Sequence, residues 1–97
     1  MQINVFTRHG SMAEATRQKI TEKMEKLGRL LDKISRIDIT VDMEKEDVST
    51  VDVLVATDYK KDFSATYSSD NLFGAVDQVL EKVSAQIRKF KEKMTEH

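Results

Sequence analysis

The stretch "RIDITVDME" (Arg36–Glu44) decides the fold, because the hydrophobic pattern of the chain changes there. Ile37, Ile39, Val41 and Met43 alternate with polar residues, which is the period-two pattern of a strand with one buried face. Before this stretch the apolar residues are spaced by three and four positions, as on a helix that buries one side. The chain therefore passes from a helix into a strand at this point.

The helix before this strand is predicted from an apolar stripe at spacings of four, three, four and three, formed by Ile20, Met24, Leu27, Leu31 and Ile34. The segment "SMAE" ahead of it can form a capping box. In that motif Ser11 accepts a hydrogen bond from the amide of Glu14, and the Glu14 carboxylate binds the Ser11 amide. Further upstream, "QINVFT" alternates and predicts a short first strand.

Two more strands and a second helix are predicted after the decisive stretch. "STVDVLVATD" and "DFSATYS" alternate, and the links "EKED" and "DYKKD" are short and polar, as hairpin connections are. From Leu72 the helical period returns, over Val76, Val79, Leu80, Val83, Ile87, Phe90 and Met94. The order is β-α-β-β-β-α, which predicts one α+β domain over residues 1–97.

This element order also predicts the layers of the domain. A crossover helix joins parallel strands, whereas hairpins join antiparallel ones, so the first two strands should be parallel and the rest antiparallel. Two amphipathic helices have one four-stranded sheet to bury against, so both should pack on the same face. We expect the other face of the sheet to be open to solvent.

The composition excludes several classes of protein. No run of eighteen apolar residues is present, so we expect no membrane span, and "MQINVFTRHG" lacks the pattern of a secretory signal. The absence of cysteine excludes disulfides and thiolate metal sites and fits a cytoplasmic protein. Phosphate-loop and nucleophile-elbow motifs are also absent, so we expect no enzyme.

Metal and cofactor sites are not expected either. His9 and His97 are far apart in the sequence, and neither has a spaced partner that completes a ligand set. The acidic run of Asp42, Glu44, Glu46 and Asp47 lacks the glycine and the ligand rhythm of a calcium loop, so it is predicted to be a solvated loop.

The formal net charge of −1 hides a strong sorting of charge along the chain. Residues 1–37 carry eight Lys or Arg against four Asp or Glu, and residues 82–97 carry five against two. The middle of the chain, residues 38–81, carries three against eleven. The predicted helices are therefore basic and most of the predicted sheet is acidic.

At 100° per residue, the basic side chains form a row beside each apolar stripe. The row on the first helix is Lys19, Lys23, Lys26 and Lys33, and the row on the last helix is Lys82, Lys89 and Lys93, with Gln86 between them. Arg88 and Lys91 point elsewhere. If both helices share one face of the sheet, the two rows can merge into one long patch. The outward positions of the strands carry Asp38, Asp42, Glu44, Asp52 and Asp62 against Arg36.

Two interpretations of these lysines stay open. They can form ordinary solvated helix faces, since Glu22 and Lys26 are spaced for an i,i+4 ion pair. They can also form an anion-binding surface, most plausibly for nucleic acid. The acidic sheet would repel a phosphate chain, so bound RNA should meet the helices. Phe90 is predicted to be a core residue, and Tyr59, in an exposed turn, is the candidate for base stacking.

The chain resembles the hibernation promoting factor and ribosome-associated inhibitor (YfiA) family of bacterial ribosome-binding proteins, in its short form. The resemblance covers essentially all 97 residues and is carried by "MQINV", "AEATRQKITEKMEKLGRLLDKI" and "DNLFGAVDQVLEKVSAQIRKFKEK". The last helix opens with the family's pattern, here Leu72, Phe73, Gly74, Ala75, Val76 and Asp77. The resemblance implies a fold similar to that of double-stranded-RNA-binding domains.

The resemblance also implies a function and a set of contact residues. Such proteins bind the small ribosomal subunit, through its rRNA, in the channel of mRNA and tRNA, and silence translation in stress or stationary phase. The family's basic positions match Arg17, Lys23, Lys26, Lys33, Lys82, Lys89, Lys91 and Lys93, to which the charge pattern adds Lys19. No cofactor, small-molecule substrate or membrane is implied. Whether a separate factor joins it to dimerise ribosomes, or it keeps single ribosomes idle, stays open.

Two alternative functions compete with this one. A non-ribosomal RNA-binding module of the same fold would show the same basic helices. A small acyl- or phosphate-cleaving enzyme of ferredoxin-like fold would need a further strand after the second helix, whereas the predicted elements end in that helix.

Overall fold

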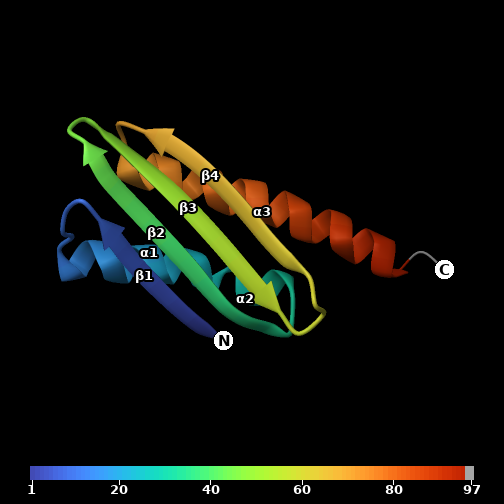
Figure 1. Cartoon of the computed structure of the whole chain (residues 1–97). Coiled ribbons are helices and arrows are strands. Elements are labelled where there is room, and N and C mark those ends of the chain that lie inside the picture. The colour runs from blue at the N-terminus through green and yellow to red at the C-terminus, as the bar shows by residue number, and fades with distance from the viewer. Residues whose placement is uncertain (96–97) are drawn as a thin grey trace.

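The computed structural model, which describes residues 1–95, has the predicted element order (Figure 1). The elements are β1 (Gln2–Arg8), α1 (Glu14–Glu25), α2 (Leu27–Leu30), β2 (Ile34–Lys45), β3 (Val48–Thr57), β4 (Asp62–Ser69) and α3 (Leu72–Thr95). The predicted α+β class is confirmed.

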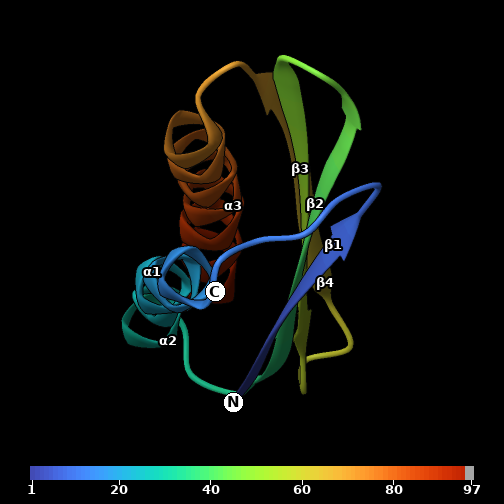
Figure 2. The same ribbon diagram turned by 90° about the vertical axis from the view of Figure 1, so that its left-hand side faces the viewer.

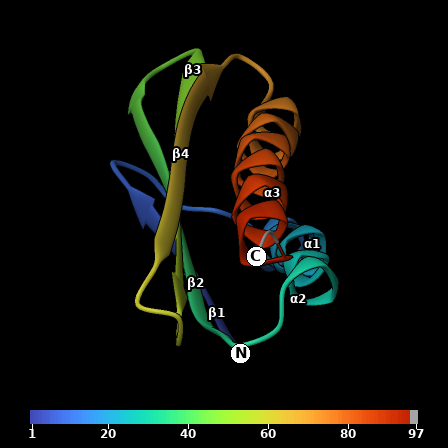
Figure 3. The same ribbon diagram turned by 90° about the vertical axis from the view of Figure 1, so that its right-hand side faces the viewer.

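The strands form one four-stranded sheet in the order β1-β2-β3-β4. β1 pairs parallel with β2, and the two hairpins pair antiparallel, as the connections predict. All helices lie on one side of this sheet, with α3 against β3 and β4 and α1 against β1 (Figures 2 and 3). No helix of the described residues covers the other face, so one face of the sheet is open.

The core lies between the sheet and the helices. Ile37, Ile39 and Val41, the inward residues of the decisive stretch, are fully buried. They meet a helix stripe that includes Val79 and Val83, which are equally buried. Burial of apolar surface of this kind is the main force that holds the helices on the sheet.

The end of the first predicted helix differs from expectation. Its five apolar stripe residues are all buried, yet the helix is broken at Lys26 and ends at Leu30. Leu31 is extended and Ile34 opens β2, so these two reach the core from a loop and a strand. Lys33 has a φ of 62°, which reverses the chain between them. The apolar stripe therefore predicted correctly which residues are buried, but it did not predict that the last two lie outside the helix.

The helix caps also differ from expectation. Ala13 is the N-cap of α1, and no side chain caps it, so the predicted capping box of Ser11 and Glu14 is wrong. In α3 the side chain of Asn71 performs this role, because its Oδ1 accepts a hydrogen bond from the amide of Gly74 at 3.0 Å. An Asn ahead of an apolar helical pattern is a recognised start signal, so the sequence contained this cap.

The C-terminal turns of α3 extend past the start of β4 at Asp62 (Figure 1). Met94 lies there and is 41% exposed, so the prediction that it belongs to the core is wrong. The apolar stripe continues one turn beyond the sheet that could bury it. None of the helices in residues 1–95 combines the length and apolar composition needed to cross a bilayer.

Candidate nucleic-acid interface

One row of basic residues on α3 lies against β4. Lys82 Nζ donates to the carbonyl of Thr66 at 3.4 Å and lies 5.2 Å from the centroid of the Tyr67 ring. Gln86 Nε2 donates to the carbonyl of Ser64 at 2.8 Å. The row therefore runs along the side of α3 that faces β4. We call Lys82, Lys89 and Lys93, together with Lys61 of the β3–β4 hairpin, the α3–β4 flank.

A second group of lysines lies where α3 meets α1 and α2. Lys23 Nζ of α1 forms an ion pair with Asp77 Oδ1 of α3 at 2.8 Å. Lys19 Nζ lies 4.5 Å from the centroid of the Phe73 ring. Lys91 Nζ donates to the carbonyl of Leu30 in α2 at 2.7 Å. We call Lys19, Lys23 and Lys91 the α1–α3 seam.

The two groups lie on opposite sides of α3, because β4 packs on one side of this helix and α1 and α2 on the other (Figure 3). Lys19 and Lys23 of the first row are therefore separated by α3 from the last row of Lys82, Lys89 and Lys93, whereas the sequence suggested that the two rows could merge. Lys91, which was expected to point away from the α3 row, does so and contacts α2 instead. The basic surface is divided into two parts with different surroundings.

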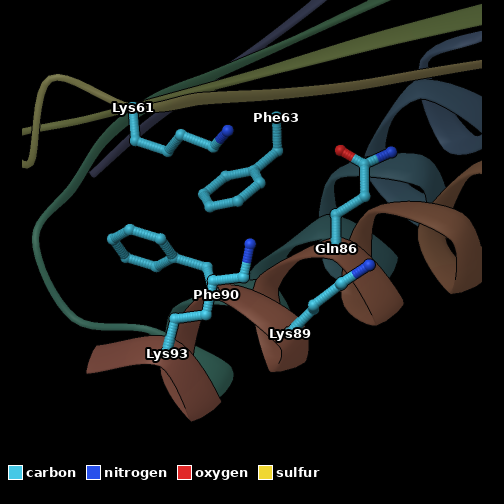
Figure 4. A pocket seen from close by; sticks show the side chains of 6 residues that line it. All are labelled: Lys61, Phe63, Gln86, Lys89, Phe90 and Lys93. Atoms are coloured by element: carbon cyan, nitrogen blue, oxygen red, sulfur yellow. The ribbon is translucent and has the colours of Figure 1, made fainter. Parts of the chain in front are cut away.

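The α3–β4 flank contains a pocket of 260 Å³. It is lined by Lys61, Phe63, Gln86, Lys89, Phe90 and Lys93. Figure 4 shows Lys61 from the hairpin and Lys93 from α3 extending toward Phe63 from opposite walls, while Lys89 extends away from them, along α3 on the side of Gln86. The hairpin and the helix thus place Lys61 and Lys93 on opposite sides of one hollow.

The lysines of this pocket lack compensating groups among residues 1–95. None of the residues that line the pocket is an Asp or Glu. The ammonium groups of Lys61, Lys89 and Lys93 form no hydrogen bond or ion pair with the described residues; Lys61 Nζ has only a long approach, 5.8 Å, to the Phe63 ring. Lysines around one pocket without a carboxylate give it a positive potential, so a bound anion would be stabilised.

Aromatic residues form the wall of the pocket. The ring of Phe90 meets Phe63 edge-on at a centroid distance of 5.6 Å and Tyr59 at 5.5 Å. Phe63 is buried, and Phe90 is half-buried and packs against the core as predicted. Tyr59 is also half-buried, and its hydroxyl donates to Asp32 Oδ1 at 2.6 Å, which raises the pKa of the tyrosine. Tyr59 is a packing residue, and the expectation of an exposed stacking ring is not met.

The remaining candidate residues differ in their surroundings. Arg17 donates from Nη1 to the carbonyl of Val5, so it joins α1 to β1, and its Nε lies 3.8 Å from Glu14. Lys26 is exposed at the junction of α1 and α2, and Lys33 is exposed in the loop before β2, with its ammonium 5.6 Å from the Tyr59 ring centroid. These three residues belong to neither the flank nor the seam.

The open face of the sheet carries the expected acidic residues. Hydrogen bonds from Arg36 at 2.7 Å and Asn4 at 2.8 Å lower the pKa of Asp38. A hydrogen bond from His9 likewise lowers the pKa of Asp42. Both carboxylates are therefore ionised at neutral pH and repel phosphate groups. The same face exposes half of Phe6, an aromatic residue that the sequence analysis did not single out.

His9 has carboxylate neighbours that its sequence position did not predict. Its Nδ1 lies 2.9 Å from Asp42 Oδ1, and ligand atoms of His9, Asp42 and Glu44 all lie within 4.8 Å of one another. The parallel register, which pairs Arg8 with Asp42, brings them together across 33 residues. The group lies at the surface, with His9 52% exposed, and its shortest contact is the hydrogen bond between His9 and Asp42. The second histidine, His97, lies outside the described residues.

The sheet order and the helices on one face define a class of small two-layer α+β proteins. The chain belongs to the family described as Sigma 54 modulation protein / S30EA ribosomal protein, whose model matches residues 3–95. The N-terminal domain of Protein Y from Thermus thermophilus has the same fold, with a TM-score of 0.82 at 16% identity over 93% of this chain and 99% of that one.

Other proteins are similar over all or nearly all of this chain. A ribosomal subunit interface protein from Coxiella burnetii superposes with a TM-score of 0.81 at 24% identity, over 95% of this chain and 99% of that one. The ribosome hibernation promoting factor of Escherichia coli K12 is 26% identical over the full length of both chains. That of Salmonella typhimurium is 23% identical, again over the full length of both.

Proposed function

We propose that the protein is a ribosome hibernation factor, and that residues 1–97 form one ribosome-binding domain. Membership of the S30EA family and full-length similarity to hibernation promoting factors support this proposal. The domain binds the small ribosomal subunit in the channel of mRNA and tRNA, and so blocks initiation in stress or stationary phase. It acts by occupying a site and not by catalysis.

The uncompensated lysines of the α3–β4 flank are the observation that carries this proposal. Lysines that already have protein partners must give them up to bind a phosphate, whereas Lys89 and Lys93 have none among residues 1–95. Each phosphate that a lysine neutralises releases condensed counterions, which supplies most of the affinity of sequence-independent RNA binding. The flank therefore faces rRNA in our account.

The acidic open face sets the orientation of the bound domain. Asp38 and Asp42, with their lowered pKa values, disfavour any pose that turns the sheet toward rRNA. Specificity then comes from the shape of the channel and not from base edges, as is usual when proteins contact RNA through phosphates.

An order-of-addition experiment tests the proposed mechanism. The protein should inhibit cell-free translation when it is added before mRNA, and much less when it is added to elongating ribosomes, because it competes for an occupied channel. Equal inhibition in both orders would contradict a site in this channel. Cosedimentation with purified small subunits separates the proposal from a non-ribosomal RNA-binding module, which would not sediment with them.

A further inference from the structure

We infer that the pocket of the α3–β4 flank seats a single nucleotide of the bound RNA. Its phosphate lies among Lys61, Lys89 and Lys93, and its sugar or base lies against Phe90. This inference deepens the proposed function and rests on it. It identifies one place where the RNA chain enters the protein surface, in contrast to a row of independent contacts along a helix.

The charges of the pocket select the phosphate. Three lysines line one hollow that contains no Asp or Glu, in a chain that has 17 acidic residues. Gln86, the remaining polar residue of the lining, holds its side-chain amide on the carbonyl of Ser64. An anion with several oxygen acceptors can receive hydrogen bonds from more than one lysine and remove their mutual repulsion.

The size and the wall of the pocket select a nucleotide over a bare anion. The volume of 260 Å³ is several times the share of about 30 Å³ that one water molecule takes, so the hollow has room for more than a small ion. The rings of Phe63 and Phe90 line the pocket beside Lys61 and Lys93 (Figure 4). Aromatic side chains beside cations are the usual surroundings of a bound nucleotide, because every base offers a face to an aromatic ring.

Lys61 is the residue that turns the helix face into a pocket, and it is held by an ordered hairpin. Thr57 Oγ1 donates to the carbonyl of Lys61 at 2.6 Å and accepts from the amide of Tyr59 at 3.2 Å. The hydroxyl of Tyr59 is in turn bound to Asp32. The turn is therefore fixed at both ends before any ligand arrives, which lowers the entropy cost of binding.

Binding of adenosine 5′-monophosphate to the full chain tests the pocket directly by NMR. We expect it to shift the ammonium signals of Lys61, Lys89 and Lys93 and the ring signals of Phe90. Inorganic phosphate should shift only the lysines, at higher concentration, and adenosine none of them. A Lys45 signal shifted as strongly as the pocket lysines would overturn the inference. Equal affinity for phosphate and for the nucleotide would overturn it too, because it would reveal a bare anion site.

The substitution Lys61→Met tests the same pocket on the ribosome, with Lys45→Met as the matched control that removes the same charge from the other hairpin. Loss of one phosphate contact should weaken binding to small subunits about fivefold at about 0.15 M salt. Equal affinities of the two variants would overturn the pocket while leaving the proposed function in place. A wild-type protein that binds no small subunits would instead overturn the proposed function.

The substitution Phe90→Leu tests the aromatic wall, because leucine keeps an apolar side chain at this position. We expect weaker binding of adenosine 5′-monophosphate and unchanged binding of inorganic phosphate. Unchanged binding of both would show that the ring does not contact the nucleotide.

Discussion

The α3–β4 flank and the α1–α3 seam place lysines on the two sides of one helix, yet these lysines differ in whether they have a partner within the protein. In the seam, Lys23 is paired with Asp77 at 2.8 Å and Lys91 with the carbonyl of Leu30 at 2.7 Å. In the flank, Lys89 and Lys93 have no such partner among residues 1–95. Lysines of the seam hold helices together, whereas Lys61, Lys89 and Lys93 of the flank are available to an external anion.

The largest effect should follow from charge reversal in the flank. Replacing Lys89 and Lys93 by Glu removes two contacts and adds two repulsions. Neutralising two contacts alone costs about twentyfold in affinity at about 0.15 M salt, so reversal should cost more and abolish binding to small subunits in a sedimentation assay. Because both side chains are exposed, the melting temperature and the circular dichroism spectrum should stay near wild type.

The matched control for this double reversal is Lys45→Glu with Lys60→Glu, which makes the same change of charge on two exposed lysines outside the pocket lining. Binding should then fall far less. If the folded Lys89 and Lys93 reversal still binds as well as this control, these lysines are ordinary solvated surface.

The difference between flank and seam also shows what the sequence could predict. Periodicity predicted all four strands and the buried faces, because burial of one face dictates the spacing of apolar residues. It placed Lys82, Lys89 and Lys93 on one side of the last helix, and Lys82 there contacts β4. Helical geometry alone fixes such positions.

Which lysines have a partner within the protein, and which line the pocket, could not be predicted in the same way. Lys23 meets Asp77 across 54 residues, and Lys61 joins the pocket only because the β3–β4 hairpin brings it opposite α3. Such pairs depend on how the elements pack, which a single sequence does not encode locally. The left-handed residues Lys33 and Lys60, with φ of 62° and 58°, also lack the glycine or asparagine that usually marks such turns.

A smaller effect on binding should follow when Lys23 of the seam loses its ion-pair partner. Asp77→Asn breaks the ion pair with Lys23 and removes a negative charge beside it. We expect affinity for small subunits to rise by up to about fivefold at about 0.15 M salt. The loss of stability should stay below about 1 kcal/mol, because the aspartate of this pair is more than half exposed. Unchanged or weaker binding would contradict the view that pairing withdraws Lys23 from RNA.

The smallest effect is expected on the open face of the sheet. Replacing Asp38, Asp42 and Asp52 by Asn should leave affinity unchanged or raise it slightly, because repulsion from phosphate groups falls. Equilibrium binding to purified small subunits measures this, with the melting temperature as the check on folding. A tenfold loss of affinity in a folded triple variant would mean that the sheet, and not the helical side, faces rRNA.

The salt dependence of binding to small subunits tests the central claim most directly. Contacts by the four flank lysines and by the exposed Lys26, about five in all, predict that log affinity falls with log salt at a slope of roughly −4. Replacing Lys61, Lys89 and Lys93 by Met should make this slope less steep by about 2 to 3 units, whereas replacing Lys19, Lys23 and Lys91 by Met should change it by less than about 1 unit. Equal changes in the two triple variants, or an unchanged slope after the flank replacement, would contradict the account.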